Sequence, residues 1–245
     1  MANTYISRTF GTPTNSAIWT LSFWIKRSAL SPSNSQKIFS AGSGSTDRTE
    51  ISFSGGVDGI NIYRNIGGST ASCNSTMKFR DTNAWYHLVF QNNNGTVAVY
   101  VNGEAETMSS TSLGTNKINL ASTIHIFGDQ VASGQNFDGL MSHIHFVDGT
   151  IYAPTVFGST DSVTGEWQIN TSPSFTPGNN GFTILKDGNT ITDQSANSNN
   201  FSLSSGTLTK SEDCPDNVFC TLNPLISTVP TAGTNSGTTG TFTNG

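Results

Sequence analysis

The stretch from Trp85 to Gly103 constrains the fold of this chain more than any other. It contains two segments, Trp85–Gln91 and Thr96–Val101, in which apolar side chains occupy every second position. Alternate residues of a strand lie on one face, so each segment presents an apolar face. The asparagines and the glycine between the segments tolerate positive φ, and Asn102-Gly103 is a strong two-residue turn signal. We therefore expect a β-hairpin with one buried side.

Short alternating segments recur along the rest of the chain and are separated by glycine-rich and asparagine-rich turns. No segment keeps the apolar spacing of a helix over helix length. One helical turn is expected at Ala153–Phe157, where proline suits the first position. This pattern predicts an all-β protein, a two-sheet antiparallel jelly-roll sandwich. Further strands are expected at Ala17–Lys26, Lys37–Ala41, Glu50–Ser54, Gly59–Arg64, Met77–Arg80, Glu104–Met108, Thr123–Phe127, Leu140–Val147, Glu166–Ile169, Gly181–Leu185 and Phe201–Ser204.

Composition excludes some classes of partner. The net charge is −5 and the eleven lysines and arginines are scattered, so no basic stripe exists and a nucleic-acid partner is not expected. No apolar run is long enough for membrane insertion, and the N-terminus does not resemble a signal peptide. Charged residues make up only 11% of the chain, against about 25% in typical domains. The surface should therefore hydrogen-bond through neutral side chains.

The three cysteines, Cys73, Cys214 and Cys220, have no metal-binding spacing. We interpret them as free thiols made in a reducing compartment, with a Cys214–Cys220 disulfide as the alternative. The amino-acid composition changes near the C-terminus, where Ser, Thr and Gly dominate. We expect a sandwich domain over residues 1–226 and an extended linker or tail over 227–245, which could lead to a further module or tether.

The hairpin, with its Trp-x-His and VYVNG sequences, resembles the central hairpin of laminin-G-like and pentraxin-like domains. Further motifs extend the resemblance over nearly the whole chain: TYISRTFGTPTNSAIWTLSFWIKR, DTNAWYHLVF, VAVYVNGE, FDGLMSHIHFVDGTIYAPTVFGSTDSVTGEW and DCPDNVFCTLNPL, in this order. Together they resemble the laminin-G-like, concanavalin A-like virion proteins of tailed bacteriophages, especially marine ones.

This resemblance implies a structural surface protein of a phage virion, made in the host cytoplasm and placed on the head as a decoration or on the tail or a fibre. Its work would be assembly and host attachment. Its partners would be other virion proteins and copies of itself, with a trimer favoured. Head or tail location, the host, the ligand and the copy number stay open at this point.

The alternative function is a lectin-like adhesin that recognises host surface polysaccharide. Aromatic side chains stack on sugars, and Trp24, Tyr63 and Tyr152 are the candidate stacking residues. Trp24 lies on the face of its strand that carries polar side chains, opposite the apolar face. Its indole either stacks on a sugar or is covered by a loop of the same chain.

A glycoside hydrolase is the third function class. Such enzymes use paired carboxylates, and the nearest pairs here are Glu104-x-Glu106 and Glu212-Asp213, neither with a third carboxylate. We therefore expect no catalytic residues.

No metal or other cofactor is expected, although calcium stays open because Asp129, Asp138 and Asp148 lie in predicted loops. His143 and His145 should share a face beside His125 on a neighbouring strand, and we expect them to bond Ser or Thr rather than a metal.

Overall fold

The strands begin and end close to the predicted positions in a computed structural model, which describes residues 3–30, 33–132 and 134–216. Their bounds are β1 Tyr5–Thr9, β2 Ile18–Arg27, β3 Gln36–Gly44, β4 Asp47–Phe53, β5 Ile60–Ile66, β6 Ser69–Asn74, β7 Tyr86–Asn93, β8 Thr96–Val101, β9 Glu104–Ala105, β10 Ile124–Phe127, β11 Gly139–Asp148, β12 Gly158–Thr160, β13 Trp167–Ile169, β14 Phe182–Ile184 and β15 Ser202–Ser205. A single 3₁₀ turn, η1 Pro154–Val156, confirms the predicted helical turn.

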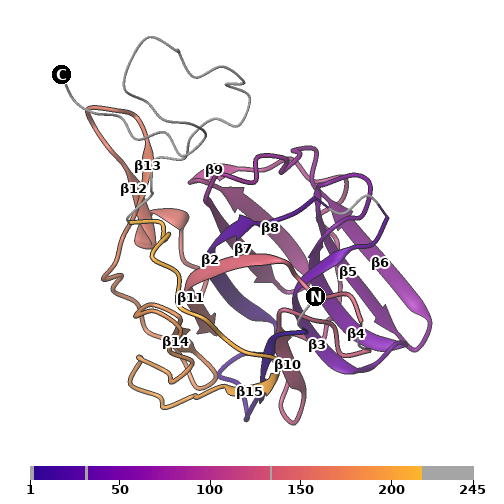
Figure 1. Cartoon of the computed structure of the whole chain (residues 1–245). Helices are drawn as coiled ribbons and strands as arrows, with labels where there is room; N and C mark the ends of the chain where they lie inside the picture. The colour runs from indigo at the N-terminus through magenta and orange to yellow at the C-terminus, as the bar shows by residue number, and fades with distance from the viewer. Residues whose placement is uncertain (1–2, 31–32, 133, 217–245) are drawn as a thin grey trace, which may run out of the picture.

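Two large antiparallel sheets are stacked face to face (Figure 1). One has seven strands in the order β15-β1-β10-β3-β4-β5-β6, and the other has six in the order β14-β11-β2-β7-β8-β9. The remaining pair, β12 and β13, forms a small hairpin that projects from one end of the sandwich (Figure 1). The predicted all-β, two-sheet sandwich is confirmed. The predicted tail, 227–245, lies outside the described residues.

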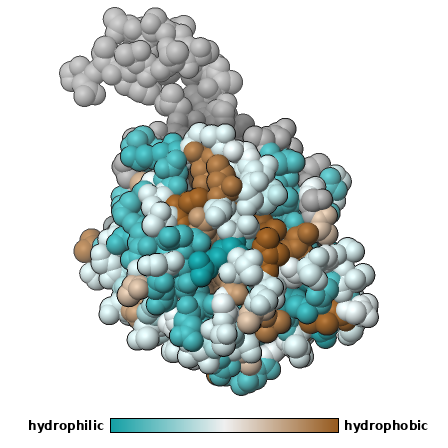
Figure 2. Space-filling view, turned by 90° about the horizontal axis from the view of Figure 1, so that it is seen from below, coloured by the Kyte–Doolittle hydropathy of each residue, from teal (hydrophilic) through white to brown (hydrophobic). Residues whose placement is uncertain are grey.

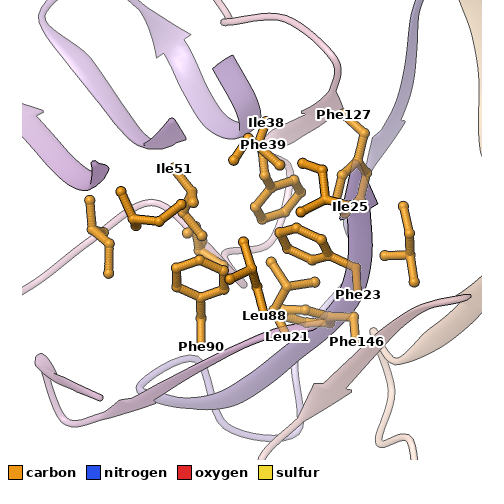
Figure 3. Close-up of a cluster of buried hydrophobic side chains, with 14 of the residues drawn as sticks. Leu21, Phe23, Ile25, Ile38, Phe39, Ile51, Leu88, Phe90, Phe127 and Phe146 are labelled. Atoms are coloured by element: carbon orange, nitrogen blue, oxygen red, sulfur yellow. The ribbon is translucent and has the colours of Figure 1, made fainter. Parts of the chain in front are cut away.

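Aromatic and branched side chains fill the space between the sheets (Figure 3). Phe23 of β2 stacks on Phe90 of β7, and Phe39 of β3 stacks on Phe127 of β10, with ring centroids 5.7 and 4.3 Å apart. All four side chains are buried. Burial of each such side chain contributes about 1.5–3 kcal/mol, so the alternating pattern read from the sequence is what holds the two layers together.

The predicted hairpin is confirmed in detail. β7 pairs with β8, and the turn residues Asn94 and Gly95 have φ of 52° and 83°. Asn102 and Gly103 follow with 49° and 85°, so both turns are of the mirror-image type that matches strand twist.

Some strand predictions were wrong at the edges. β9 ends at Ala105 because Glu106 turns its carboxylate to a neighbouring loop, where Oε1 accepts hydrogen bonds from the Thr76 and Met77 amides. Residues 77–80 form no strand. β12 was not predicted, and neither were β1 and β6. Their short polar sequences carry a weak alternation signal, and pairing with β10 and β5 stabilises them.

Hydrophilic and neutral side chains cover most of the molecular face in Figure 2, with hydrophobic residues gathered in separate patches.

Candidate functional site

The outer face of the six-stranded sheet is covered by the segment 150–177. Val89 and Val147 of the sheet pack with Phe157, and Tyr152 and Phe175 join this second, smaller cluster. The segment therefore shields Val89 and Val147 of this face from solvent.

Trp24 lies on this covered face, and its side chain is only 5% exposed. Its ring stacks on that of His87, with centroids 5.0 Å apart. The expectation that Trp24 is an exposed platform for a sugar was wrong. The alternative, that other parts of the chain cover it, is correct.

Trp167 of β13 anchors the covering segment to the sheet. Its Nε1 donates a hydrogen bond of 3.0 Å to Nδ1 of His87. A Cβ added to Gly103 or Gly158 would lie 2.4 or 2.7 Å from the indole ring, so glycine is needed on both sides of it. The contact explains structurally why His87, Gly103, Gly158 and Trp167 occur in the Trp-x-His, Asn-Gly, Phe-Gly and Glu-Trp sequences.

Tyr63 and Tyr152 do not lie together. Tyr63 is on β5 of the seven-stranded sheet, half-buried, with the Arg48 guanidinium 5.5 Å from its ring centre. Tyr152 lies on the covering segment, where its hydroxyl accepts a hydrogen bond from the Thr176 amide and its ring meets Phe175 edge-on. The two tyrosines cannot form one site, and sugar stacking by either stays a prediction.

A cleft of about 440 Å³ opens elsewhere, beneath residues 207–216, which we call the strap. The strap follows β15 and runs past β11 as the yellow-orange trace in Figure 1. Asp213 fastens it to the sandwich: its carboxylate bonds Lys26 Nζ at 2.6 Å and Trp85 Nε1 at 2.9 Å. The strap cleft is lined by apolar Trp85, Phe137, Leu140, Met141 and Leu208, and by polar Asp138, Ser142, His143, Lys186, Asn189 and Thr209.

A strained bulge builds the inner wall of the strap cleft. The pairing of β11 with β2 shifts register between Ser142 and His145, so one extra residue lies in β11. His143 has a φ of 49°, and Leu185, whose carbonyl accepts the His143 amide at 3.0 Å, has a φ of 55°. Positive φ costs a bulky residue about 1–3 kcal/mol, and such strain gathers at functional sites. Bulges also re-aim side chains beside binding sites.

The bulge breaks the regular alternation of faces along β11. Simple alternation places Leu140, Ser142, Ile144 and Phe146 on one face, whereas the register shift sends Ile144 and Phe146 into the core and leaves Ser142 opposite Trp24 on the outer face. Strand parity cannot foresee an inserted residue, so the wall of the cleft was missed.

The histidines behave as predicted in bonding but not in position. His143 Nδ1 lies 2.8 Å from Ser142 Oγ, and His145 Nδ1 lies 3.0 Å from Thr183 Oγ1. His125 is on β10 of the other sheet and faces the core, where it stacks on Phe10 at 3.5 Å. His125 is therefore not a neighbour of the other two.

Burial lowers the pKa of these rings. Desolvation lowers the pKa of His87, His125 and His145 to about 3, and it lowers the pKa of His143 as well. All four are neutral at pH 7. His87 Nδ1 accepts from Trp167, so its proton is on Nε2, which donates to Ser22 Oγ at 2.9 Å.

The carboxylates considered for calcium do not gather. Asp148 is buried and accepts four hydrogen bonds, from the amides of Thr14, Asn15 and Asn180 and from Asn119 Nδ2. A shell of N–H donors repels a cation, so Asp148 is unsuited to calcium.

The other two calcium candidates have different surroundings from Asp148. Asp129 Oδ1 accepts the amides of Gln130 and Gln135, while Asp138 lines the strap cleft. Among the described residues no group of three or more His, Cys, Asp or Glu side chains could hold a metal ion.

The acidic pairs considered for catalysis have structural tasks. Glu106 caps the loop at Thr76, and Asp213 fastens the strap. Cys73 is buried, and Cys214 Sγ lies 2.8 Å from Asp216 Oδ1. Cys220, and with it the alternative disulfide, lies outside the described part of the chain.

No helix in the part of the chain that the structure describes is long and apolar enough to cross a lipid bilayer.

Comparison with known proteins connects this architecture to a family. A family model described as the concanavalin A-like lectin/glucanases superfamily matches residues 2–157. No curated protein matches the sequence. Among solved structures, a putative carbohydrate-binding protein from Bacteroides ovatus is 16% identical with a TM-score of 0.58, over 89% of this chain and 60% of that one. This likeness shows the fold.

Two further structures are similar with TM-scores below 0.5. Domain 4 of an extracellular arabinanase from Geobacillus stearothermophilus, in complex with arabinotriose, is 22% identical with a TM-score of 0.46, over 57% of this chain and 64% of that one. The enzymatically active domain of tailspike protein 2 from bacteriophage CBA120 is 12% identical with a TM-score of 0.45, over 59% and 24%. The chain spans less than two thirds of all three proteins.

Proposed function

The chain belongs to the concanavalin A-like lectin/glucanases superfamily, and on this basis we propose that it binds glycan in the strap cleft without cleaving it, as a surface protein of a bacteriophage virion. The observation that carries the glycan-binding part is the cleft itself. Its volume of about 440 Å³ falls within the range of about 300–1,000 Å³ typical of ligand pockets.

The lining of the strap cleft suits a sugar. Sugars present apolar C–H faces and a rim of hydroxyls, and the cleft offers the apolar Trp85, Leu140 and Met141 next to the polar His143 and Lys186. The strained bulge fixes the polar side of this wall before a ligand arrives, which lowers the entropic cost of binding. Tyr63 and Tyr152 lie outside the cleft and are not part of this proposal.

Binding without cleavage is supported by the contacts of Glu212 and Asp213, two of the acidic residues that line the cleft. Glycoside hydrolysis needs one carboxylic acid to donate a proton and a second carboxylate on the other side of the bond. In the strap cleft, Asp213 is held by Lys26 and Trp85, and Glu212 faces Lys210 at 3.5 Å. Incubation with a bound oligosaccharide should therefore release no new reducing ends.

Two features support the virion role. The sequence motifs that resemble those of phage virion proteins occur in the same order over nearly the whole chain, and charged residues are few. A surface that hydrogen-bonds through neutral groups loses little when salt changes outside a cell. Several copies on one particle would raise weak single-site binding by avidity, by a factor of about 10²–10⁴. We propose other virion proteins and a homotrimer as the assembly partners.

A bulky side chain on the strap tests the glycan site. Thr209→Trp places an indole in the cleft, and we expect it to weaken binding to any polysaccharide fragment captured by the wild type at least about ten-fold, because the ring occupies sugar volume. Ser162→Trp, on the exposed hairpin between β12 and β13, is the matched control and should bind as wild type. Equal binding by both variants would place the sugar elsewhere.

Electron microscopy of the intact phage particle tests the virion role. Density for the sandwich on the head lattice would identify a decoration, and density at the tail would identify an adhesion component. Absence of the chain from purified particles would refute the virion role while leaving the glycan site in place.

A further inference from the structure

A second hollow adjoins the strap cleft across β11 and β14. It measures about 240 Å³ and is lined by His145, Phe175, Pro177, Thr183 and Gln194, among others. We call it the His145 groove. The rings of His143, which lines the strap cleft, and His145 are 6.4 Å apart, so the bulge in β11 separates the two hollows.

Lys186 lines both the strap cleft and the His145 groove. It follows directly after Leu185, one of the two residues with strained positive φ at the bulge. The local geometry therefore places a flexible cationic side chain at the boundary between the two hollows.

Lys186 is half-buried and has no ion pair or hydrogen bond among the described residues. The other lysines near the cleft are occupied, because Lys26 pairs with Asp213 at 2.6 Å and Lys210 faces Glu212 at 3.5 Å. Both neighbouring histidines are neutral at pH 7, since burial lowers their pKa. The boundary thus carries one positive charge with no direct partner in the part of the chain that the structure describes.

Acidic side chains also lie near this boundary. Asp187 and Asp216 both interact electrostatically with His143. Each already accepts a side-chain contact, Asp187 from the Gln194 amide and Asp216 from the Cys214 thiol. Asp216 also lines the strap cleft, together with Asp138, Glu212 and Asp213, whereas no described carboxylate lines the His145 groove. The carboxylates repel an anion within the cleft, so the site for an anionic group of the ligand is at Lys186, on the boundary with the groove.

We propose that the glycan is an acidic oligosaccharide of at least two sugar units, which extends from the strap cleft into the His145 groove and presents a carboxylate or sulfate to Lys186. This inference rests on the proposed glycan binding and specifies its ligand. A charge-assisted hydrogen bond to an ammonium is stronger than one between neutral groups. The smaller groove takes the second unit beside Phe175.

The test measures binding of Lys186→Gln, with Lys186→Arg and Lys78→Gln as controls, to uronate-containing and sulfated oligosaccharides and to their carboxyl-reduced or desulfated counterparts. Lys78 is an exposed lysine outside both hollows. We expect Lys186→Gln to lose about ten-fold or more in affinity for the acidic ligands and to keep wild-type affinity for the neutral ones. Lys186→Arg should retain most of the binding, and Lys78→Gln all of it.

Single sugars should bind more weakly than the corresponding disaccharides, because they leave one hollow empty. Equal affinity of the wild type for acidic and neutral forms, or an equal loss for both in Lys186→Gln, would overturn the inference and leave the proposed glycan binding intact. Failure of every oligosaccharide, acidic or neutral, to bind the wild type would overturn both.

Discussion

Acidification from pH 7 to pH 4 is expected to unfold the sandwich. The pKa of His87, His125 and His145 is about 3 in the folded protein, because burial disfavours the charged ring, and about 6.5 in the unfolded chain. The unfolded chain therefore binds more protons between these values. The neutral rings contribute full stability above about pH 6.5, and this contribution falls as the pH drops toward about 3.

Each histidine contributes about 1.4 kcal/mol per pH unit in this window, so the three together give about 4 kcal/mol per unit. A domain whose free energy of unfolding is about 5–15 kcal/mol does not stay folded when this loss accumulates over several pH units. Two of the rings also accept hydrogen bonds that protonation removes, from Trp167 Nε1 to His87 and from the Asn119 amide to His125. The free energy of unfolding, measured in urea between pH 7.5 and pH 4.5, gives the slope.

His145→Gln provides the control for the pH prediction. It removes one titrating ring and keeps a polar group opposite Thr183, so the slope between pH 6 and pH 5 should decrease by about a third. A wild-type stability that stays flat from pH 7.5 to pH 5 would contradict the burial of these rings as neutral groups.

Asp148→Ala is expected to lower the free energy of unfolding by about 3–5 kcal/mol at pH 7. The Asp148 carboxylate binds four N–H donors, at 2.6 Å from Thr14, 3.1 Å from Asn15, 3.1 Å from Asn180 and 2.7 Å from Asn119 Nδ2. Alanine would leave these donors unsatisfied where water has little access. Urea or thermal unfolding measures the loss.

Two further substitutions show whether the effect of Asp148→Ala comes from the buried N–H donors. Asp148→Asn keeps the shape but points an amide N–H toward N–H donors, so it should also be strongly destabilising. Asp161→Ala removes a carboxylate that accepts the amides of Val163 and Thr164 on the exposed hairpin, and it should have a small effect because water replaces the lost contacts. Equal losses for Asp148→Ala and Asp161→Ala would contradict the role of burial.

The sheet architecture could be predicted because it depends on a regular period. Phe23, Phe90 and Val99 belong to apolar sets that occupy every second position of their strands, and all three side chains point into the core. Asn94-Gly95 and Asn102-Gly103 fixed the hairpin turns through local backbone preference. Where a residue type and a spacing together determine the geometry, the sequence contains the answer.

The candidate site could not be predicted because it depends on departures from that period. The bulge at His143 reverses the parity of β11, and the cleft exists only where the strap returns over a strand about 70 positions earlier in the sequence. The sequence around Asp213 does not indicate that it contacts Lys26 and Trp85, because both residues are far from it in the chain. Trp24 was a candidate for sugar stacking because Thr20 and Ser22, on the same face of its strand, are polar, and the sequence left covering by a loop open; in the structure Trp24 is buried.

Titration of the isotopically labelled protein with an oligosaccharide that it binds, followed by NMR, tests the glycan site most directly. We expect saturable shifts of the Trp85 indole N–H, the Met141 methyl and the Lys186 amide, with the outer face of the other sheet around Tyr63 unchanged. Shifts centred on Tyr63 or on the exposed hairpin tip at Val163, with the strap cleft silent, would contradict the account.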